Sequence, residues 1–203
     1  MSVAVAADLV ASMLNPSLDS WDQAPGSLEI EKIVSSSLAR EFLPSSESPD
    51  ALITTGGTES NLMAMLFARE KSECGGQSLQ IICSEHAHHS LLRATLLLGL
   101  RDPIPVATRS GEMETDSLEA TVRGIEGPKA IVATAGTTDH GVVDDLVAIA
   151  RIAKASGSWL HVDAAYGGPL IWSSTRRKYL EGLRFADSIT VDFHKFGWQP
   201  LAA

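Results

Sequence analysis

The chain has 203 residues, which is enough for one large domain or two small ones. Hydrophobic residues make up 44% of the sequence and charged residues 20%, so a globular core is expected. The net charge of −9 argues against a partner with a negatively charged surface, whether nucleic acid or an anionic membrane.

Cysteine usage and hydropathy indicate a reducing, aqueous compartment. Cys74 and Cys83 are the two cysteines, and they support neither a disulfide framework nor a CxxC metal site. No apolar run reaches the length of a membrane span, and the N-terminus lacks a basic region followed by an apolar one. We therefore expect a cytoplasmic protein.

The first fifty residues predict an N-terminal helical segment and a linker. An apolar stretch ends at Asn15-Pro16, where a helix should stop. Residues 21–26 are rich in turn formers, and Ser27 is a candidate cap for the helix that follows. A loop rich in serine and proline then extends to Pro49.

Residues 51–203 predict one α/β domain. Short β-type segments alternate with helical ones, which is the pattern of βαβ units and predicts a mainly parallel sheet with helices on both faces. The expected strands cover residues 51–55, 79–83, 104–107, 130–134, 159–163 and 188–191, and the expected helices cover residues 58–72, 87–98, 117–124 and 143–155.

Two glycines stand between the first expected strand and its helix, in the sequence Gly56-Gly57-Thr58. They would let the backbone approach a ligand closely, and the first turn of the helix presents free N–H groups. This arrangement suits a phosphate, with the Thr58 hydroxyl as a further donor. An ordinary tight turn capped by Thr58 is the alternative, and the Gly-Lys-Ser/Thr of a Walker A loop is absent.

Three histidines, His86, His88 and His89, follow the next expected strand. A metal site would need a ligand spacing such as HExxH, which the sequence lacks. An imidazole that stacks on an aromatic ligand, or that donates a proton, fits better. We expect His86 and His89 to be exposed residues at the start of a helix.

Hydroxyl and carboxylate side chains follow two later strands. Thr137 could hold a polar edge of a ligand, whereas Asp144 or Asp145 should cap the helix after it. Asp163 ends an apolar strand, where a poorly solvated carboxylate needs a cationic partner such as a protonated pyridine nitrogen. A capping or structural aspartate is the alternative.

The last expected strand delivers His194 and Lys195 to its carboxyl end, where open α/β sheets place their chemistry. A lysine can form an imine with an aldehyde only when its amine is deprotonated, which requires a desolvated or cationic setting. Taken alone, the pair is also compatible with a surface lysine or a phosphate-binding lysine.

Together, these motifs resemble the fold-type-I enzymes that use pyridoxal 5'-phosphate, and within them the group II amino-acid decarboxylases. The resemblance covers most of the chain, from DSWDQAPGSLEIE through TTGGTESNL, SEHAHHSLLRA, ATAGTTDHGVVDDL and HVDAAYGG to DFHKFGWQP. The residues after Lys195 are most similar to the bacterial L-2,4-diaminobutyrate decarboxylase branch.

The resemblance implies roles for the residues around the cofactor ring. Lys195 would hold the cofactor as a Schiff base, and Asp163 would pair with the pyridine nitrogen. His88 would stack on the exposed face of the ring and help to protonate the product, while Ala165 would pack on the other face. Thr137 would lie near the phenolic oxygen or the substrate carboxylate.

The resemblance also assigns the phosphate to Gly57, Thr58 and His194. Asp192 and Phe193 depart from the common Asn-Pro-His-Lys version of the motif. A carboxylate at Asp192 would repel a phosphate unless it points away from it, so the role of Asp192 as a cofactor-binding residue depends on its orientation.

The activity that the resemblance implies is decarboxylation of an L-amino acid to a primary amine and carbon dioxide. Candidate substrates are 2,4-diaminobutyrate, glutamate and aromatic amino acids. The expected assembly is a homodimer with its active site at the interface, without a metal, nucleic acid or membrane.

Members of that family are longer on both sides, so the chain is expected to be a central fragment that lacks the small C-terminal domain. Two other functions stay open. One is a catalytically inactive fragment that binds pyridoxal phosphate, and the other is a different reaction of the same cofactor, such as transamination or oxidative aldehyde formation.

Overall fold

The structure is a computed structural model that describes residues 2–17, 22–72 and 79–200. Within these ranges, five parallel strands form one sheet in the order β2-β1-β5-β6-β7. The predicted α/β class and the mainly parallel sheet are confirmed. The strands are β1 Gln80–Ser84, β2 Ile104–Val106, β5 Lys129–Thr134, β6 Trp159–Ala164 and β7 Ser188–Val191.

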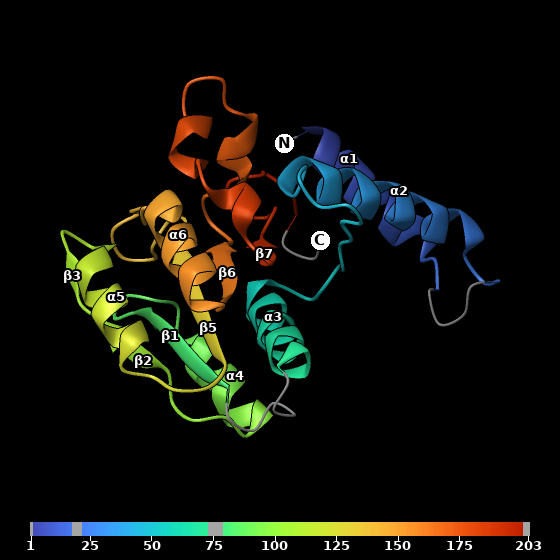
Figure 1. Ribbon diagram of the computed structural model, residues 1–203. Coiled ribbons are helices and arrows are strands. Elements are labelled where there is room, and N and C mark those ends of the chain that lie inside the picture. The colour runs from blue at the N-terminus through green and yellow to red at the C-terminus, as the bar shows by residue number, and fades with distance from the viewer. Residues whose placement is uncertain (1, 18–21, 73–78, 201–203) are drawn as a thin grey trace.

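Helices cover both faces of this sheet, as Figure 1 shows, with α3 and α4 on one side and α5 and α6 on the other. Ile82 and Ile131 point into the core with α5 and α6, whereas Ile81 and Val132 point into the core with α3 and α4. Because both faces are covered, the central strands are buried over almost their whole length. The helices are α1 Ser2–Leu14, α2 Pro25–Phe42, α3 Gly57–Lys71, α4 Ser90–Leu98, α5 Thr115–Arg123 and α6 Leu146–Ser156.

The side of the sheet on which the chain adds strands changes between β1 and β5. The chain leaves β1 for β2 on one side and later adds β5, β6 and β7 on the other side. Open α/β sheets bind ligands in the crevice beyond the carboxyl ends of the strands at such a change of side. The segments that follow β1, β5, β6 and β7 therefore converge on one edge of the sheet.

The strand predicted over residues 51–55 is wrong, because this segment is irregular. The Thr55 backbone N–H and hydroxyl both donate to Glu59 Oε2 at 2.6 Å, and Thr54 Oγ1 lies 2.7 Å from Ser60 Oγ. These local bonds with the first turn of α3 replace the ladder that a strand would need. The segment is therefore the entry to α3.

Helix boundaries also differ from the sequence-based expectation. Ser27 does not cap α2, because that helix already begins at Pro25, a residue that is favoured in a first turn. Asp145 does cap α6, and its Oδ1 accepts a hydrogen bond from the Ala148 N–H at 2.9 Å. Two positions that the sequence singled out, Trp21 in the linker and Cys74, lie outside the described residues.

Short elements went unpredicted because they span too few residues for a periodic pattern. A hairpin of β3 Thr108–Arg109 and β4 Glu112–Met113 turns at Ser110-Gly111. The 3-10 helices η1 Gly168–Trp172, η2 Arg177–Leu180 and η3 Leu183–Phe185 connect β6 to β7. None of the helices in the described ranges has both the length and the hydrophobicity that crossing a membrane requires.

Candidate active site

A cavity of about 780 Å³ lies at the carboxyl ends of β1, β5, β6 and β7. It brings together residues from five separate segments of the chain. All nine residues predicted to bind a cofactor line it: Gly57, Thr58, His88, Thr137, Asp163, Ala165, Asp192, His194 and Lys195.

The N-terminus of α3 borders this cavity. A Cβ on Gly57 would lie 3.4 Å from Ala165 Cβ and 3.8 Å from Asp192 Oδ2, so glycine keeps this part of the cavity open. The first N–H groups of a helix have no intrahelical acceptor, and together with the helix dipole they attract an anion. This end of the cavity therefore suits a phosphate group.

Asp163 places a buried carboxylate at the carboxyl end of β6, where it is 7% exposed. Its Oδ2 accepts a hydrogen bond from Asn61 Nδ2 at 2.7 Å, and its Oδ1 accepts one from the Ala165 N–H at 3.1 Å. Both carboxylate oxygens therefore accept a hydrogen bond from an N–H group. No cationic side chain in the described ranges forms an ion pair with Asp163. The Asp163 carboxylate is therefore available to pair with a positive charge on a ligand.

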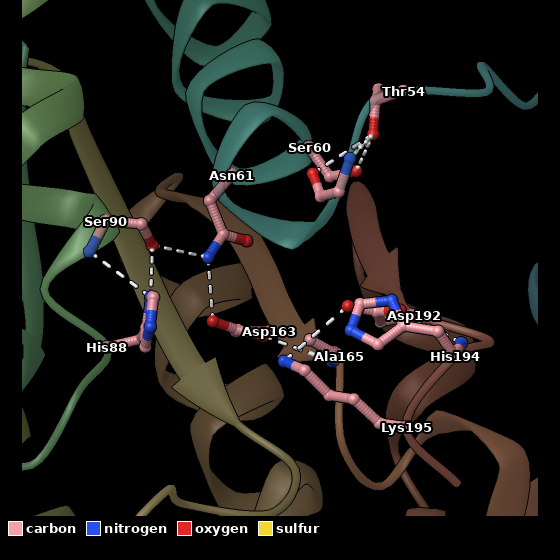
Figure 2. Close-up of polar contacts among 11 residues, drawn as sticks. Thr54, Ser60, Asn61, His88, Ser90, Asp163, Ala165, Asp192, His194 and Lys195 are labelled. Atoms are coloured by element: carbon pink, nitrogen blue, oxygen red, sulfur yellow. Dashed lines mark hydrogen bonds and ion pairs between the residues drawn. The ribbon is translucent and has the colours of Figure 1, made fainter. Parts of the chain in front are cut away.

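Lys195 lies in a group of ionisable side chains after β7, together with Asp192 and His194 (Figure 2). Its Nζ is 3.6 Å from Asp192 Oδ2, and the other oxygen of Asp192 contacts His194 Nδ1 at 2.5 Å. The Asp192 side chain is 4% exposed, whereas that of Lys195 is 38% exposed. The Asp192 carboxylate is therefore engaged by two basic groups, which offsets the repulsion that its charge would exert on a nearby phosphate.

His88 is half-buried at the edge of the cavity, and its Nδ1 lies 2.9 Å from Ser90 Oγ. Burial lowers the pKa of His88, as does the adjacent His89, whose ring centroid is 4.1 Å away, and the charge of Asp163 acts in the opposite direction. His88 is therefore neutral near pH 7.

The other two histidines of this segment differ in exposure. His89 is exposed, as predicted. The exposure predicted for His86 is wrong, because its half-buried ring packs edge-on against His140 at 5.1 Å and lines the cavity. No group of three or more potential metal ligands lies together in the described part of the chain.

Two threonines at the end of β5 and just after it, Thr134 and Thr137, complete the lining. Thr137 is buried, and its Oγ1 accepts a hydrogen bond from the Val142 N–H at 3.1 Å. Thr134 Oγ1 is buried and has no hydrogen-bond partner among the described residues, so an acceptor on a ligand would satisfy it. With the α3 N-terminus, Asp163 and Lys195, these residues fit pyridoxal phosphate, which carries a phosphate, a ring nitrogen and an aldehyde.

Three buried polar residues were missed from the sequence: Asn61, which lines the cavity, and its hydrogen-bond partners Ser90 and His161. Each carried a signal. Asn61 shares the buried face of α3 with Met65 and Ala68, where an apolar residue would be expected. His161 lies within an apolar strand. A polar residue at an apolar position usually has a specific partner.

Comparisons with known proteins identify the family to which this chain is similar. Residues 1–202 match the family model described as the pyridoxal-dependent decarboxylase conserved domain. The L-2,4-diaminobutyrate decarboxylase of Rhizobium meliloti is 41% identical over 98% of this chain and 41% of its own length. The L-2,4-diaminobutyrate decarboxylase of Acinetobacter baumannii is 35% identical over 97% of this chain and 44% of its own length.

A solved structure shows the same similarity. It is the glutamate decarboxylase domain of a diaminobutyrate-pyruvate transaminase and L-2,4-diaminobutyrate decarboxylase from Vibrio parahaemolyticus. It is 38% identical, with a TM-score of 0.87 over 98% of this chain and 48% of that structure. The chain thus spans less than half the length of the relatives it matches.

Proposed function

We propose that this chain, which belongs to the pyridoxal-dependent decarboxylase family, supplies the cofactor-binding part of an amino-acid carboxy-lyase. The family and the pyridoxal cofactor predicted from the sequence are confirmed by the family match. The proposed reaction removes the α-carboxylate of an L-amino acid as carbon dioxide and leaves a primary amine. The observation that carries the proposal is the single cavity that all nine predicted residues line.

Each of the residues predicted from the sequence has a proposed task. Bound pyridoxal phosphate supplies an aldehyde that reacts with amines and a ring that withdraws electrons from a breaking bond at Cα. Lys195 supplies the amine that holds the cofactor, and it must lose a proton before it can react. Asp163 stabilises a positive charge on the ring nitrogen. His88 holds or moves a proton at the cavity wall.

The remaining contacts concern the phosphate and the polar edge of the ligand. Gly57 and Thr58 offer the N-terminus of α3 to the phosphate, and His194, paired with Asp192, adds a basic group beside it. Ala165 packs against a face of the ring, and Thr137 lies toward the polar edge of the ligand.

The first substrate to test is 2,4-diaminobutyrate. Two of the relatives are L-2,4-diaminobutyrate decarboxylases, and the residues after Lys195 resemble that branch. Glutamate and aromatic amino acids are the alternatives.

A homodimer with its active site at the interface is part of the proposal. Helix α1 has no buried residue, and its apolar side chains Val3, Leu9, Met13 and Leu14 are all at least 60% exposed. Such a surface is typical of a helix that is covered in an assembly, and a second copy of the chain would cover it. The low cysteine content supports a reducing compartment, and we propose the cytoplasm.

The test of this proposal is to add pyridoxal phosphate to the purified protein and record its absorbance near the edge of the visible range. Lys195→Ala should abolish the band, whereas Lys154→Ala, at an exposed position of α6 outside the cavity, should retain it. Carbon dioxide release from 2,4-diaminobutyrate and other amino acids then tests turnover. A band that survives Lys195→Ala contradicts the role of Lys195, and a band without release from any amino acid contradicts the decarboxylase activity.

A further inference from the structure

A series of side-chain hydrogen bonds links Asp163 to His88 through the buried residues Asn61 and Ser90 (Figure 2). Asn61 projects from α3 between them, with its Nδ2 2.7 Å from Asp163 Oδ2 and 2.9 Å from Ser90 Oγ. Ser90 Oγ in turn lies 2.9 Å from His88 Nδ1. Asn61 and Ser90 are each 1% exposed, so bulk water does not compete for these bonds.

Asp163 determines which group donates and which accepts in each bond of this series. An ionised carboxylate has only acceptors, so Asn61 must turn its amide nitrogen, and not its amide oxygen, toward Asp163. The amide oxygen then faces His161 Nε2 at 3.1 Å, which must carry a proton to donate to it.

His161 Nδ1 also faces the Ser188 carbonyl oxygen at 3.2 Å, so the direction of the Asn61–His161 bond is fixed by Asp163 and not by His161 itself. Its ring is fully buried, and this burial lowers the pKa of His161 to about 4, so the ring is neutral with one proton. With that proton on Nε2, Nδ1 is free to accept a hydrogen bond from the Ser188 hydroxyl, whose oxygen is 2.9 Å away. Ser188 Oγ itself accepts a hydrogen bond from Trp159 Nε1 at 2.9 Å.

The donor and acceptor roles of the bonds between Asn61, Ser90 and His88 follow in the same way. Ser90 Oγ accepts a hydrogen bond from Asn61 Nδ2, so the hydrogen of the Ser90 hydroxyl is available to His88 Nδ1. The Ser90 backbone N–H also points at that nitrogen, at 3.3 Å. With two donors directed at Nδ1, this nitrogen is an acceptor and the ring proton is on Nε2.

We propose that Asn61 and Ser90 are positioning residues that hold His88 as the neutral tautomer protonated on Nε2. Because Nδ1 is engaged, Nε2 is the nitrogen left to donate a proton to a ligand in the cavity. The same Asn61 amide orients the Asp163 carboxylate, so one side chain aligns two of the predicted cofactor contacts. The role of this proton rests on the proposed function, but the tautomer itself requires no cofactor.

The tautomer is measured directly by nuclear magnetic resonance on the purified protein with 15N-labelled histidine and no added cofactor. Long-range 1H–15N correlations report which ring nitrogen carries the proton, and His88→Gln identifies the His88 signals. The wild-type protein should show the proton on Nε2. A proton on Nδ1 in the wild type overturns the proposal.

Two substitutions of Ser90 and one control test its contribution. Ser90→Ala removes the hydroxyl donor and should give a mixture of both tautomers, whereas Ser90→Thr keeps a hydroxyl and should restore the Nε2 form. The control is Thr95→Val, which removes a fully buried hydroxyl from the same helix. This hydroxyl donates to the Leu92 carbonyl and does not contact Asn61, Ser90 or His88, so the tautomer of His88 should stay the same. An unchanged tautomer in Ser90→Ala excludes control by the hydroxyl.

Asn61→Asp tests the direction of the bonds, because the new carboxyl group shares one proton with Asp163, and the oxygen that replaces Nδ2 can then only accept from Ser90. The Ser90 hydroxyl should then turn toward the new carboxyl group, and the proton of His88 should move to Nδ1. If this variant fails to fold, the Ser90 variants decide the question. A folded Asn61→Asp protein that keeps the Nε2 tautomer contradicts the proposal.

Turnover separates this inference from the proposed function. If the protein is a decarboxylase, Ser90→Ala should lower kcat about 10-fold at nearly unchanged KM, since the variant impairs a proton transfer and leaves substrate binding intact. A protein that releases no carbon dioxide but shows the predicted tautomers would refute the proposed function alone. Unaltered tautomers in an active Ser90→Ala enzyme would refute the positioning role alone.

Discussion

At the scale of single residues, Asp163 is the side chain whose charge matters most to the proposed chemistry. Asp163→Asn keeps the shape of the side chain but removes the negative charge opposite the ring nitrogen. Carbon dioxide release should fall on the order of 100-fold, the usual effect of removing one electrostatic stabiliser from an active site.

The control for this substitution is Asp145→Asn, since asparagine caps a helix about as well as aspartate does. Its activity should equal that of the wild type. Full activity in Asp163→Asn would exclude Asp163 as the partner of the ring nitrogen.

His161 makes the stability of the fold depend on pH. Its pKa is lowered from 6.5 to about 4, so between these values the unfolded chain binds a proton that the folded chain does not. The free energy of unfolding should therefore fall as the pH decreases from about 6.5 toward 4, by on the order of 3 kcal/mol.

Urea unfolding at pH 7 and at pH 5 measures this effect. His161→Gln should remove most of the difference between the two pH values, whereas His89→Gln, at an exposed position, should leave it unchanged. A His161→Gln protein with the same pH dependence as the wild type would show that another group is responsible.

At the scale of elements, the turn after β6 depends on the close approach of two backbones. A Cβ on Gly167 would collide with the backbone carbonyl oxygen of Ala135, the residue directly after β5, and a backbone atom cannot move aside as a flexible side chain can. Gly167→Ala should lower the free energy of unfolding by about 3 kcal/mol, measured by urea unfolding.

Gly124→Ala is the matched control, because its nearest neighbour would lie 3.5 Å from the added Cβ, at an ordinary contact distance. Its free energy of unfolding should change by much less. Equal destabilisation by the two substitutions would mean that the contact with Ala135 is not the cause.

Helix α6 depends on its N-terminal cap. Asp145 Oδ1 accepts a hydrogen bond from the Ala148 N–H, which otherwise has no partner within the helix. Asp145→Ala should lower the free energy of unfolding by about 1 kcal/mol, and Asp145→Ser should recover most of the loss. Thermal unfolding followed by circular dichroism compares the three proteins, and a stable alanine variant would argue against the cap.

At the scale of the whole molecule, the exposed apolar side of α1 makes the proposed homodimer testable. Met13 is 76% exposed on this helix. Met13→Lys should weaken dimerisation at least 10-fold, because the charge would be buried in the interface. Sedimentation equilibrium measures the change.

Ala11→Lys adds the same charge two positions away, on another side of the helix, and should leave the assembly unchanged. Equal weakening by both substitutions would indicate a general effect of charge. A Met13→Lys protein that dimerises like the wild type would place the interface elsewhere.

Most of the site could be predicted from the sequence because its information is local. The site residues lie next to segments with a strand or helix pattern, and these residues include glycines, histidines, Asp163 and Lys195. Parallel strands bring their carboxyl ends to one edge of the sheet. Through the family that they resemble, the motifs indicated both the cofactor and the nine residues that line one cavity. The alternation of strands and helices indicated the sheet for the same reason, since periodicity is a property of neighbouring residues.

The tertiary structure decided what depends on contacts between distant segments. Residues 51–55 have β-type side chains, but their polar groups bind the first turn of α3. Asn61 meets His161 from 100 positions away, and no local pattern encodes that pairing. Which group donates and which accepts around His88 follows from the contact between Asp163 and Asn61, both of which are buried. Only packing excludes the water that would otherwise hydrogen-bond to these side chains.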